Sequence, residues 1–392
     1  MKKPSLCVIV ESGIDVRLVE ELATAYNLEV LARKKVLGKE ISQEPKVRVN
    51  LKLGPCSRSK FAFFVLKYLL KKRGEFDFII VQNYGMPALA TNLASRLTGV
   101  PSAMLVCSPT ELYYLCRKKT NEKELPFRWY ELMAIKLLAR MNAIIGRQYI
   151  VLSEFLKKVV EGHGTRRPIR IIPIYGVDAN IFAPTKEPKT KLRHNLSLPE
   201  KGKIVFFSSR IAPEKDTITL LRAIKYLRGK GRNIYLLNRS GGYKSLLRYA
   251  IEINIRDSVI AAEAVHPYKE LPEIYNACDL CVQASVEEGL GFSALEALCC
   301  EIPVIASQVG GLKETIINEK TGWTYLPGNA RMLAKRIETV LDNPKEGKIR
   351  AKEGRKLVLA RYEKRKVFRE LQKLIKQNLD QLRFIENPLC GV

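Results

Sequence analysis

The most constraining feature of this chain is an alternation of short apolar runs with segments that have helical spacing. Residues 6–10, 76–81 and 102–106 are apolar runs, and residues 16–26 and 88–97 between them have the periodicity of amphipathic helices. Short apolar runs joined through helices are typical of buried parallel strands in a doubly wound sheet. The sequence therefore predicts an α/β fold with parallel sheets.

The alternation stops once and then starts again. Over residues 183–203 the composition shifts to prolines and lysines without apolar periodicity, as expected of a linker. A chain of 392 residues also exceeds what one hydrophobic core usually holds. We therefore predict two Rossmann-like domains. Their expected bounds are 1–183 for the first domain, 184–202 for the linker, 203–365 for the second domain and 366–392 for a helical tail packing back toward the first.

The composition implies an anionic partner. Lys and Arg number 67 against 40 Asp and Glu, which gives a formal net charge of +27. Such a charge attracts nucleic acid, an acidic membrane surface or phosphorylated substrates. No apolar run is long enough to cross a bilayer. Glu11 interrupts the first run, so we expect a first strand there, not a secretory leader, and a cytoplasmic protein.

Cysteine usage points to reduced, buried thiols. The nine cysteines are an odd number, and most lie in apolar surroundings. Cys278 and Cys281 form a CxxC, but no second pair completes a metal-binding pattern. We expect no metal or redox role for them.

A glycine-rich turn, Glu288-Gly-Leu-Gly-Phe-Ser-Ala-Leu-Glu296, lies between an apolar run and a helical segment. Glycine lets the backbone approach a ligand, and a helix start offers free N–H groups to an anion. Two carboxylates facing one crevice beside such amides suit a ligand with hydroxyls and phosphate, as in a nucleotide sugar. Taken alone, the spacing fits an ordinary strand-turn-helix unit equally well.

A second segment, Ser208-Ser-Arg-Ile-Ala-Pro-Glu-Lys215, carries two cations around an expected helix start. Pro213 suits the first helical position. Arg210 and Lys215 then bracket a helix N-terminus, where both are placed to neutralise a departing nucleoside diphosphate. The alternative is that both are solvated surface cations.

These two segments, together with residues 303–314 and Thr321-Gly-Trp323, resemble the retaining glycosyltransferases of family 4, which have the GT-B fold. The resemblance covers residues 203–345 almost continuously and the first half more loosely. It implies two Rossmann-like doubly wound domains facing a central cleft. It also implies that the first domain binds the acceptor and the second binds a nucleotide sugar.

The resemblance assigns roles to individual residues. Glu288, Arg210 and Lys215 would form the catalytic set, with Glu288 contacting the donor sugar. Glu296 would hold the ribose hydroxyls. The remaining donor-binding positions that it implies are Gly13, Arg239, Gly241, Gly242, Val265, Gly289, Leu290, Gly291 and Phe292.

The first half departs from the family pattern at two histidines. Where many members have histidine, this chain has Cys107-Ser-Pro-Thr-Glu111 after one strand, and Gln82 and Asn83 after another. We place Gln82, Asn83, Ser108 and Glu111 on the acceptor side. His163, His194 and His266 receive no catalytic role.

The chain contains no Asp-x-Asp, the pair that holds a divalent metal in the other large glycosyltransferase fold. We therefore expect no metal and no other cofactor. In a retaining transfer the departing phosphate takes the acceptor's proton, so the protein supplies position and charge. The expected acceptor is a hydroxyl of a glycan or a lipid-linked glycan.

Two alternatives stay open. One is a sugar-nucleotide 2-epimerase of the same fold. The other is a non-catalytic protein that binds anions or RNA, although the basic residues are not interleaved with aromatics as in single-strand binders. We expect no nucleic-acid partner. The absence of G-x-G-x-x-G argues against a dehydrogenase.

Lysines in residues 60–73 suggest a further partner. Lys60, Lys67 and Lys71 fall on one helical face, and the apolar residues of the segment, Phe63 and Leu70 among them, are expected to be buried. One interpretation is a core helix whose lysines face water. The other is a domain that docks on an anionic membrane surface from the cytoplasmic side.

Overall fold

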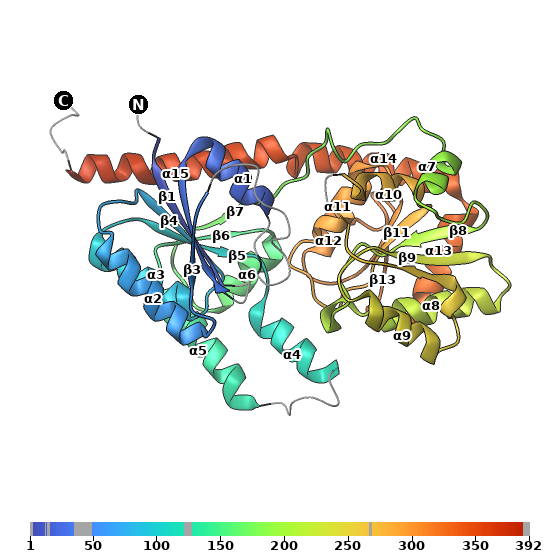
Figure 1. The fold of residues 1–392 in the computed structure, drawn as a ribbon, viewed down its shortest axis with the longest axis horizontal. Coiled ribbons are helices and arrows are strands. Elements are labelled where there is room, and N and C mark those ends of the chain that lie inside the picture. Colours follow the sequence, from blue (N-terminus) through green and yellow to red (C-terminus); the bar gives the residue numbers. More distant parts are fainter. Residues whose placement is uncertain are drawn as a thin grey trace. The chain divides into compact units, whose positions relative to one another are not determined.

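The computed structural model describes residues 3–11, 13, 16–34, 49–120, 128–265 and 269–386 (Figure 1). The chain divides into two compact units. Unit 1 comprises Met1–Glu111, Arg128–Tyr175 and Arg365–Val392, and unit 2 comprises Leu112–Phe127 and Gly176–Lys364.

Unit 1 is built on a seven-stranded parallel sheet in the order β3-β2-β1-β4-β5-β6-β7. Its strands are β1 (Ser5–Val10), β2 (Asn27–Arg33), β3 (Asn50–Gly54), β4 (Phe78–Gln82), β5 (Ser102–Val106), β6 (Gln148–Val151) and β7 (Ile169–Ile171). Its helices are α1 (Val16–Ala25), α2 (Arg58–Lys71), α3 (Met86–Thr98), α5 (Trp129–Ile145), α6 (Glu154–Gly162) and, from Arg365 onward, α15 (Lys364–Glu386). Helix α4 (Thr110–Thr120) begins in unit 1 and is assigned to unit 2 from Leu112.

Unit 2 has a six-stranded parallel sheet in the order β10-β9-β8-β11-β12-β13. Its strands are β8 (Lys203–Phe206), β9 (Ile234–Asn238), β10 (Val259–Ala261), β11 (Leu280–Gln283), β12 (Val304–Ser307) and β13 (Trp323–Tyr325). Its α-helices are α7 (Lys189–Asn195), α8 (Thr217–Gly229), α9 (Tyr243–Glu252), α10 (Leu271–Ala277), α11 (Phe292–Cys299), α12 (Leu312–Thr315), α13 (Ala330–Asp342) and α14 (Pro344–Arg361). The doubly wound α/β architecture expected from the sequence is confirmed in both units.

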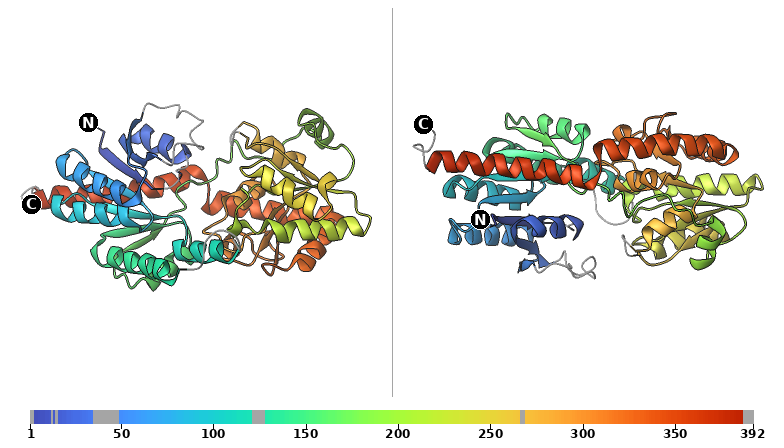
Figure 2. Two further views of the ribbon diagram at one scale, coloured as in Figure 1. Left: turned by 60° about the horizontal axis from the view of Figure 1, so that its bottom comes forward. Right: turned by 90° about the horizontal axis from the view of Figure 1, so that it is seen from above.

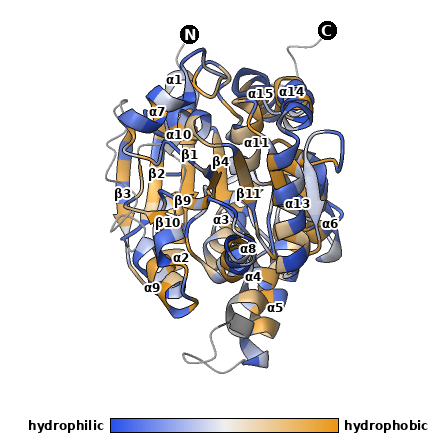
Figure 3. Cartoon of the chain, turned by 90° about the vertical axis from the view of Figure 1, so that its right-hand side faces the viewer, coloured by the Kyte–Doolittle hydropathy of each residue, from blue (hydrophilic) through white to orange (hydrophobic). Residues whose placement is uncertain are grey.

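Continuous apolar runs become the central strands because both faces of each sheet are covered by helices. All of β1 after Ser5 is buried, and β4, β5 and β11 are buried throughout. The strands are accordingly coloured as hydrophobic in Figure 3. In a parallel sheet the carboxyl ends of all strands meet at one edge, so the loops after the strands of each unit gather there.

The segment expected to be a linker, residues 184–202, lies within unit 2 and contains α7. Arg193 of α7 is buried and donates to the carbonyl oxygens of Ala277, Glu200 and Gly202, and it pairs with Asp279 at 2.7 Å. The sequence did not indicate this helix, because seven residues give little periodicity and the segment is rich in proline and lysine.

The C-terminal part of the chain is helical, as expected, but it serves both units. Helix α14 packs on α11 and α13 in unit 2. Helix α15 belongs to unit 1 from Arg365, and it lies along that unit in the views of Figure 2. Gln148 of β6 donates to Asn378 of α15 at 2.7 Å.

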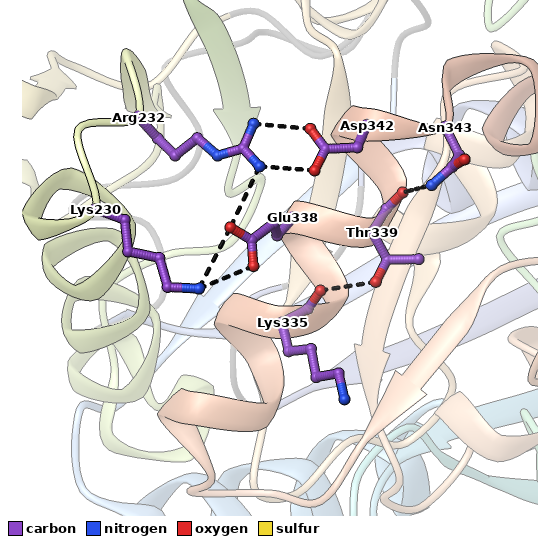
Figure 4. A network of polar contacts seen from close by, with 7 residues as sticks. All are labelled: Lys230, Arg232, Lys335, Glu338, Thr339, Asp342 and Asn343. Carbon is purple, nitrogen blue, oxygen red and sulfur yellow. Dashed lines mark hydrogen bonds and ion pairs between the residues drawn. The ribbon is translucent and has the colours of Figure 1, made fainter.

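A surface network joins the end of α8 to α13 (Figure 4). Arg232 forms ion pairs with Asp342 at 2.7 Å and Glu338 at 3.3 Å, and Lys230 pairs with Glu338 at 3.1 Å. The two helices also pack closely against each other. The ion pairs lie at the rim of this contact, where solvent screens them.

Helix α2 departs from expectation in part. Lys60, Lys67 and Lys71 are exposed together, as the spacing predicted. Phe63 and Leu70 are also exposed, whereas they were expected to be buried. They lie on the lysine side of the helix, opposite the face that packs into unit 1.

Candidate active site

The loop after β8 carries the two predicted cations of unit 2. Pro213 begins a single 3₁₀ turn, Pro213–Lys215, and α8 starts only at Thr217. Asp216 caps α8, because its carboxylate accepts from the backbone N–H of Thr219 at 3.3 Å. The prediction that Arg210 and Lys215 bracket a helix N-terminus is therefore corrected: Arg210 precedes a 3₁₀ turn, Lys215 is the last residue of that turn, and α8 behind it has its own cap.

Lys215 and Glu288 lie together. Lys215 Nζ forms an ion pair with Glu288 Oε2, and both side chains are mostly buried. Ser285 Oγ donates to the same carboxylate oxygen at 3.1 Å. The structure thus brings together two of the three residues predicted to be catalytic, from the loops after β8 and β11.

Arg210, the third of that set, is more open. Its side chain is 56% exposed and lies 3.4 Å from a carboxylate oxygen of Glu214, which is fully buried. The carbonyl oxygen of Glu214 accepts from the N–H of Val286 at 2.9 Å, which ties the β8 loop to the β11 loop. The loop that carries Arg210 is therefore held in place, and the exposed guanidinium is accessible to a ligand.

The glycine-rich turn fits tightly between its neighbours. Gly291 caps α11 with φ of +95°, a conformation that only glycine adopts readily. Gly311 donates its N–H to the carbonyl oxygen of Glu288 at 3.0 Å, and a Cβ at Gly311 would lie 2.6 Å from the Cα of Leu290. Close packing of the residue 310–311 turn fixes the backbone of Gly289 and Leu290.

Glu296 is buried in α11 next to Tyr275 of α10. The Tyr275 hydroxyl lies 3.2 Å from Glu296 Oε2, 2.9 Å from Ser208 Oγ and 3.1 Å from the carbonyl oxygen of Ser293. Burial, and then the charge of Glu296, raise the pKa of Tyr275 well above its ordinary value. Tyr275 is therefore a neutral donor that positions Glu296. Sequence reasoning missed it, because an aromatic residue in an amphipathic helix usually signals core packing.

The predicted residues of the β9 loop also lie close to the β8 loop. Ile211 donates its N–H to the carbonyl oxygen of Gly241 at 2.9 Å, and Val265 donates its N–H to the carbonyl oxygen of Arg239 at 3.4 Å. Gly242 caps α9 with φ of +92°. Arg239 Nε is buried and has no hydrogen-bond partner among the described residues. An orphaned guanidinium donor in this position is suited to an anion.

In unit 1 the predicted residues lie at the carboxyl edge of the sheet. Gln82 Nε2 donates to the carbonyl oxygen of Gly13 at 3.1 Å, which joins the loops after β4 and β1. Asn83 has φ of +60°, and its buried Oδ1 has no hydrogen-bond partner among the described residues. Ser108, in the loop after β5, is partly buried.

Both carboxylate oxygens of Glu111, at the start of α4, form hydrogen bonds. His163 Nε2 lies 2.7 Å from one oxygen, and the Tyr84 hydroxyl donates to the other. Burial works to raise the pKa of Glu111, but the hydrogen bonds from His163 and Tyr84 outweigh it and lower the pKa. His163, which received no role from the sequence, thus forms a buried network with Glu111, and its Nδ1 has no partner among the described residues.

Tyr113, in the part of α4 assigned to unit 2, is a further residue that sequence reasoning missed. Burial raises its pKa well above the ordinary value, and the negative charges of Glu288 and Glu214 add to this effect. Tyr113 is therefore a neutral phenol that senses the charges of Glu288 and Glu214. No motif pointed to it.

The described residues contain no group of three His, Cys, Asp or Glu that gathers closely enough to hold a metal ion. Cys278 and Cys281 are both fully buried in unit 2. Burial raises the pKa of Cys281 to about 12 and that of Cys278 well above its ordinary value. Both thiols therefore stay protonated and are poor nucleophiles.

Comparison with known proteins shows which sequences this chain is similar to. Residues 188–357 match the family model for glycosyl transferases group 1. The chain is 28% identical to 2-deoxystreptamine glucosyltransferase of Streptomyces kanamyceticus, over 70% of each chain. It is 31% identical to a GDP-mannose-dependent phosphatidylinositol monomannoside mannosyltransferase of Mycolicibacterium smegmatis, over 38% of this chain and 40% of that relative.

Solved structures show the same fold over nearly the whole chain. Sucrose-phosphate synthase from Thermosynechococcus elongatus superposes with a TM-score of 0.78 at 22% identity, covering 95% of this chain and 98% of that one. Anabaena HepE in complex with UDP and glucose gives a TM-score of 0.77 at 17% identity, covering 95% and 99%. The chain has the GT-B fold and is an enzyme of the glycosyltransferase class. Within it, residues 188–357 form a glycosyltransferase group 1 domain.

Proposed function

We propose that the chain is a retaining glycosyltransferase that moves a sugar from a nucleotide sugar to a hydroxyl acceptor without a metal ion. The observation that carries this proposal is the Lys215–Glu288 pair at the carboxyl edge of the unit 2 sheet, with Arg210 in the same loop as Lys215. The pair joins a cation suited to the diphosphate with a carboxylate suited to the sugar hydroxyls.

The donor is held by its nucleotide in unit 2. Glu296, positioned by Tyr275, accepts from the ribose hydroxyls, and the N–H groups of Gly289 to Phe292 line the diphosphate. The orphaned Nε of Arg239 supplies a further donor to a phosphate oxygen. Supporting this, HepE has been solved with UDP-glucose, and the Mycolicibacterium relative is named for GDP-mannose.

The transfer needs charge stabilisation more than a protein base. The bond between the anomeric carbon and the phosphate oxygen breaks, and the acceptor oxygen bonds to the same carbon on the same face. The acceptor's proton passes to the departing phosphate oxygen. Arg210 and Lys215 stabilise the negative charge that grows on the diphosphate, and this kind of preorganised stabilisation is worth about 3 kcal/mol per group.

The acceptor is a hydroxyl of a glycan or a lipid-linked glycan, and the loops of unit 1 that carry Gln82, Asn83, Ser108 and Glu111 bind it. Relatives of the chain support this class, since one is named as a lipopolysaccharide N-acetylglucosaminetransferase and another acts on a phosphatidylinositol mannoside. The enzyme then works in the cytoplasm as a peripheral protein on the inner face of the membrane. None of the described helices is long and apolar enough to cross a bilayer.

The test is an assay of nucleotide release from UDP-, GDP- and ADP-sugars with candidate acceptors, in excess EDTA. We expect transfer to continue in the chelator, and proton NMR of the product to show the anomeric configuration of the donor. Activity that EDTA abolishes and magnesium or manganese restores would contradict the metal-free mechanism. Conversion of the donor to its 2-epimer without an acceptor would instead establish an epimerase.

A further inference from the structure

Unit 1 exposes far more apolar surface than unit 2. Of the nineteen large hydrophobic residues that are exposed in the described part of the chain, eleven lie on α2, α3 and α5 of unit 1. In unit 2 such residues are isolated on separate elements, as on ordinary protein surfaces. The concentration on three helices requires a separate explanation.

Helix α5 carries the most exposed apolar side chains. Ile144 is 70% exposed and Trp129 is 69% exposed. The spacing of three to four residues places them on one stripe along the helix. The full stripe comprises Trp129, Tyr130, Met133, Leu137, Met141 and Ile144.

The opposite side of α5 packs into unit 1 through Ala139, Asn142 and Ala143. Asn142 donates to the carbonyl oxygen of Tyr84 at 2.9 Å and accepts from Asn92 at 2.8 Å. The helix is therefore fixed with its outer stripe toward solvent. A helix that is apolar on both sides is typical of one that is covered on both sides.

Helices α3 and α2 continue this surface. Helix α3 packs against both α2 and α5, so the three helices follow one another across unit 1 (Figure 1). Helix α3 exposes Met86, Leu93 and Leu97, the last of them by 65%. Helix α2 exposes Phe63 and Leu70. The exposed side of α2, α3 and α5 is called the three-helix face below.

The three-helix face also carries basic residues. The three helices contain seven Lys and Arg and one acidic residue, Glu131. On α2, Phe63 lies between the exposed residues Lys60 and Lys67, and on α5 the exposed residue Arg140 lies beside the apolar stripe. Apolar residues flanked by cations are typical of protein surfaces that bind an anionic bilayer, where the apolar side chains reach the acyl chains and the cations contact the headgroups.

We propose that the three-helix face docks unit 1 on an anionic lipid bilayer, with the α5 stripe inserted at the level of the headgroups and acyl chain boundary. Trp129 and Tyr130 at the start of α5 suit this boundary, where aromatic side chains are enriched. The lysines of α2 contact lipid phosphates. This inference is independent of the donor chemistry proposed above, because it concerns a different surface and needs no substrate.

Charge favours lipid over a second copy of the chain. Pairing two such faces would bring the lysines of α2 and Arg140 of α5 against their own copies, and the whole chain carries a net charge of +27. Like charges brought together at an interface oppose association. An anionic bilayer removes the same repulsion by supplying the counter-charge.

The test is co-sedimentation of the full chain with vesicles of phosphatidylcholine, with and without phosphatidylglycerol. We expect binding to the anionic vesicles at low salt, release at high salt, and little binding to phosphatidylcholine alone. The double variant Leu137→Gln/Ile144→Gln should bind about tenfold more weakly or worse. Its matched control, Ile251→Gln/Ile349→Gln, changes two exposed isoleucines of unit 2 helices and should bind like the unaltered chain.

A second arm tests the charges. Lys60→Gln/Lys67→Gln/Lys71→Gln should weaken binding by about fivefold per lysine, or about a hundredfold in total. The control Lys345→Gln/Lys348→Gln/Lys352→Gln removes three exposed lysines of α14 and the same net charge, and it should have a much smaller effect. All these sites are exposed, so circular dichroism should show unaltered folding.

Three results would overturn the proposal. In the first, the unaltered chain stays in the supernatant with phosphatidylglycerol vesicles at low salt. In the second, the unit 1 variants and their unit 2 controls lose binding equally. In the third, sedimentation velocity without lipid shows a dimer that Leu137→Gln/Ile144→Gln converts to a monomer, which would make the face an interface between copies.

Discussion

At the residue scale, the proposed donor side is a set of polar groups held by the loops at the carboxyl edge of the unit 2 sheet. Lys215 is paired with Glu288, and Glu296 is positioned by the Tyr275 hydroxyl. In the proposed function, a diphosphate that attracts Lys215 weakens the Lys215–Glu288 ion pair and frees the Glu288 carboxylate for the sugar. In that proposal the pair links binding of the nucleotide to release of the carboxylate.

The Glu111 network makes a prediction about pH. The pKa of Glu111 is lowered in the folded chain, so the ionised carboxylate stabilises the fold above the ordinary value of 4.5. That stabilisation is lost as the pH falls through the lowered folded value. Glu111→Gln should therefore reduce the free energy of unfolding at pH 7, and the difference from the unaltered chain should shrink by pH 3. Urea unfolding of the unaltered chain and Glu111→Gln at pH 7 and pH 3 measures the two free energies of unfolding. A difference between them that grows toward pH 3 would contradict the lowered pKa of Glu111.

At the element scale, apolar periodicity predicted the central strands and the helices between them because both faces of each sheet are buried. It missed β3 and β13, since β3 is a mostly exposed edge strand and β13 has only three residues. The resemblance grouped Arg210, Lys215 and Glu288 as one catalytic set. It did not show the 3₁₀ turn, the Asp216 cap or the Tyr275 hydrogen bonds, which depend on tertiary packing.

Two ion pairs on different elements allow a matched test of α7. Arg193 is buried, donates to three carbonyl oxygens and pairs with Asp279. Arg193→Ala leaves the three carbonyl oxygens without this donor, while Asp279 keeps its ion pair with Lys189 at 3.3 Å, so the variant should cost about 3 kcal/mol. Arg232 of the network in Figure 4 is 44% exposed, and Arg232→Ala should cost only about 0.2–1 kcal/mol.

Thermal unfolding measures both variants. A large loss of Tm for Arg193→Ala beside a small one for Arg232→Ala would show that residues 184–202 are an integral part of unit 2. Equal, small losses would show that α7 is a loosely held linker, as the composition of that segment first indicated.

At the scale of the whole molecule, the two units differ in how much apolar surface they expose. Unit 2 gathers its specific groups at the sheet edge and exposes few apolar residues, whereas unit 1 carries the three-helix face. The net charge of +27 predicted an anionic partner without choosing one. Two anionic partners are proposed above: a diphosphate at the edge of the unit 2 sheet and a lipid surface at the three-helix face of unit 1.

The central claim is that the loops after β8 and β11 bind a nucleoside diphosphate. Isothermal titration calorimetry with UDP, GDP and ADP tests it most directly, using the unaltered chain, Arg210→Ala, Lys215→Ala and the control Lys225→Ala, which removes an exposed lysine of α8. We predict that one diphosphate binds and that Arg210→Ala and Lys215→Ala each weaken it by about tenfold to a hundredfold, as expected for loss of a charge-assisted hydrogen bond. Lys225→Ala should bind like the unaltered chain. If no diphosphate binds, or if all three variants bind it like the unaltered chain, the donor site assigned to unit 2 is wrong.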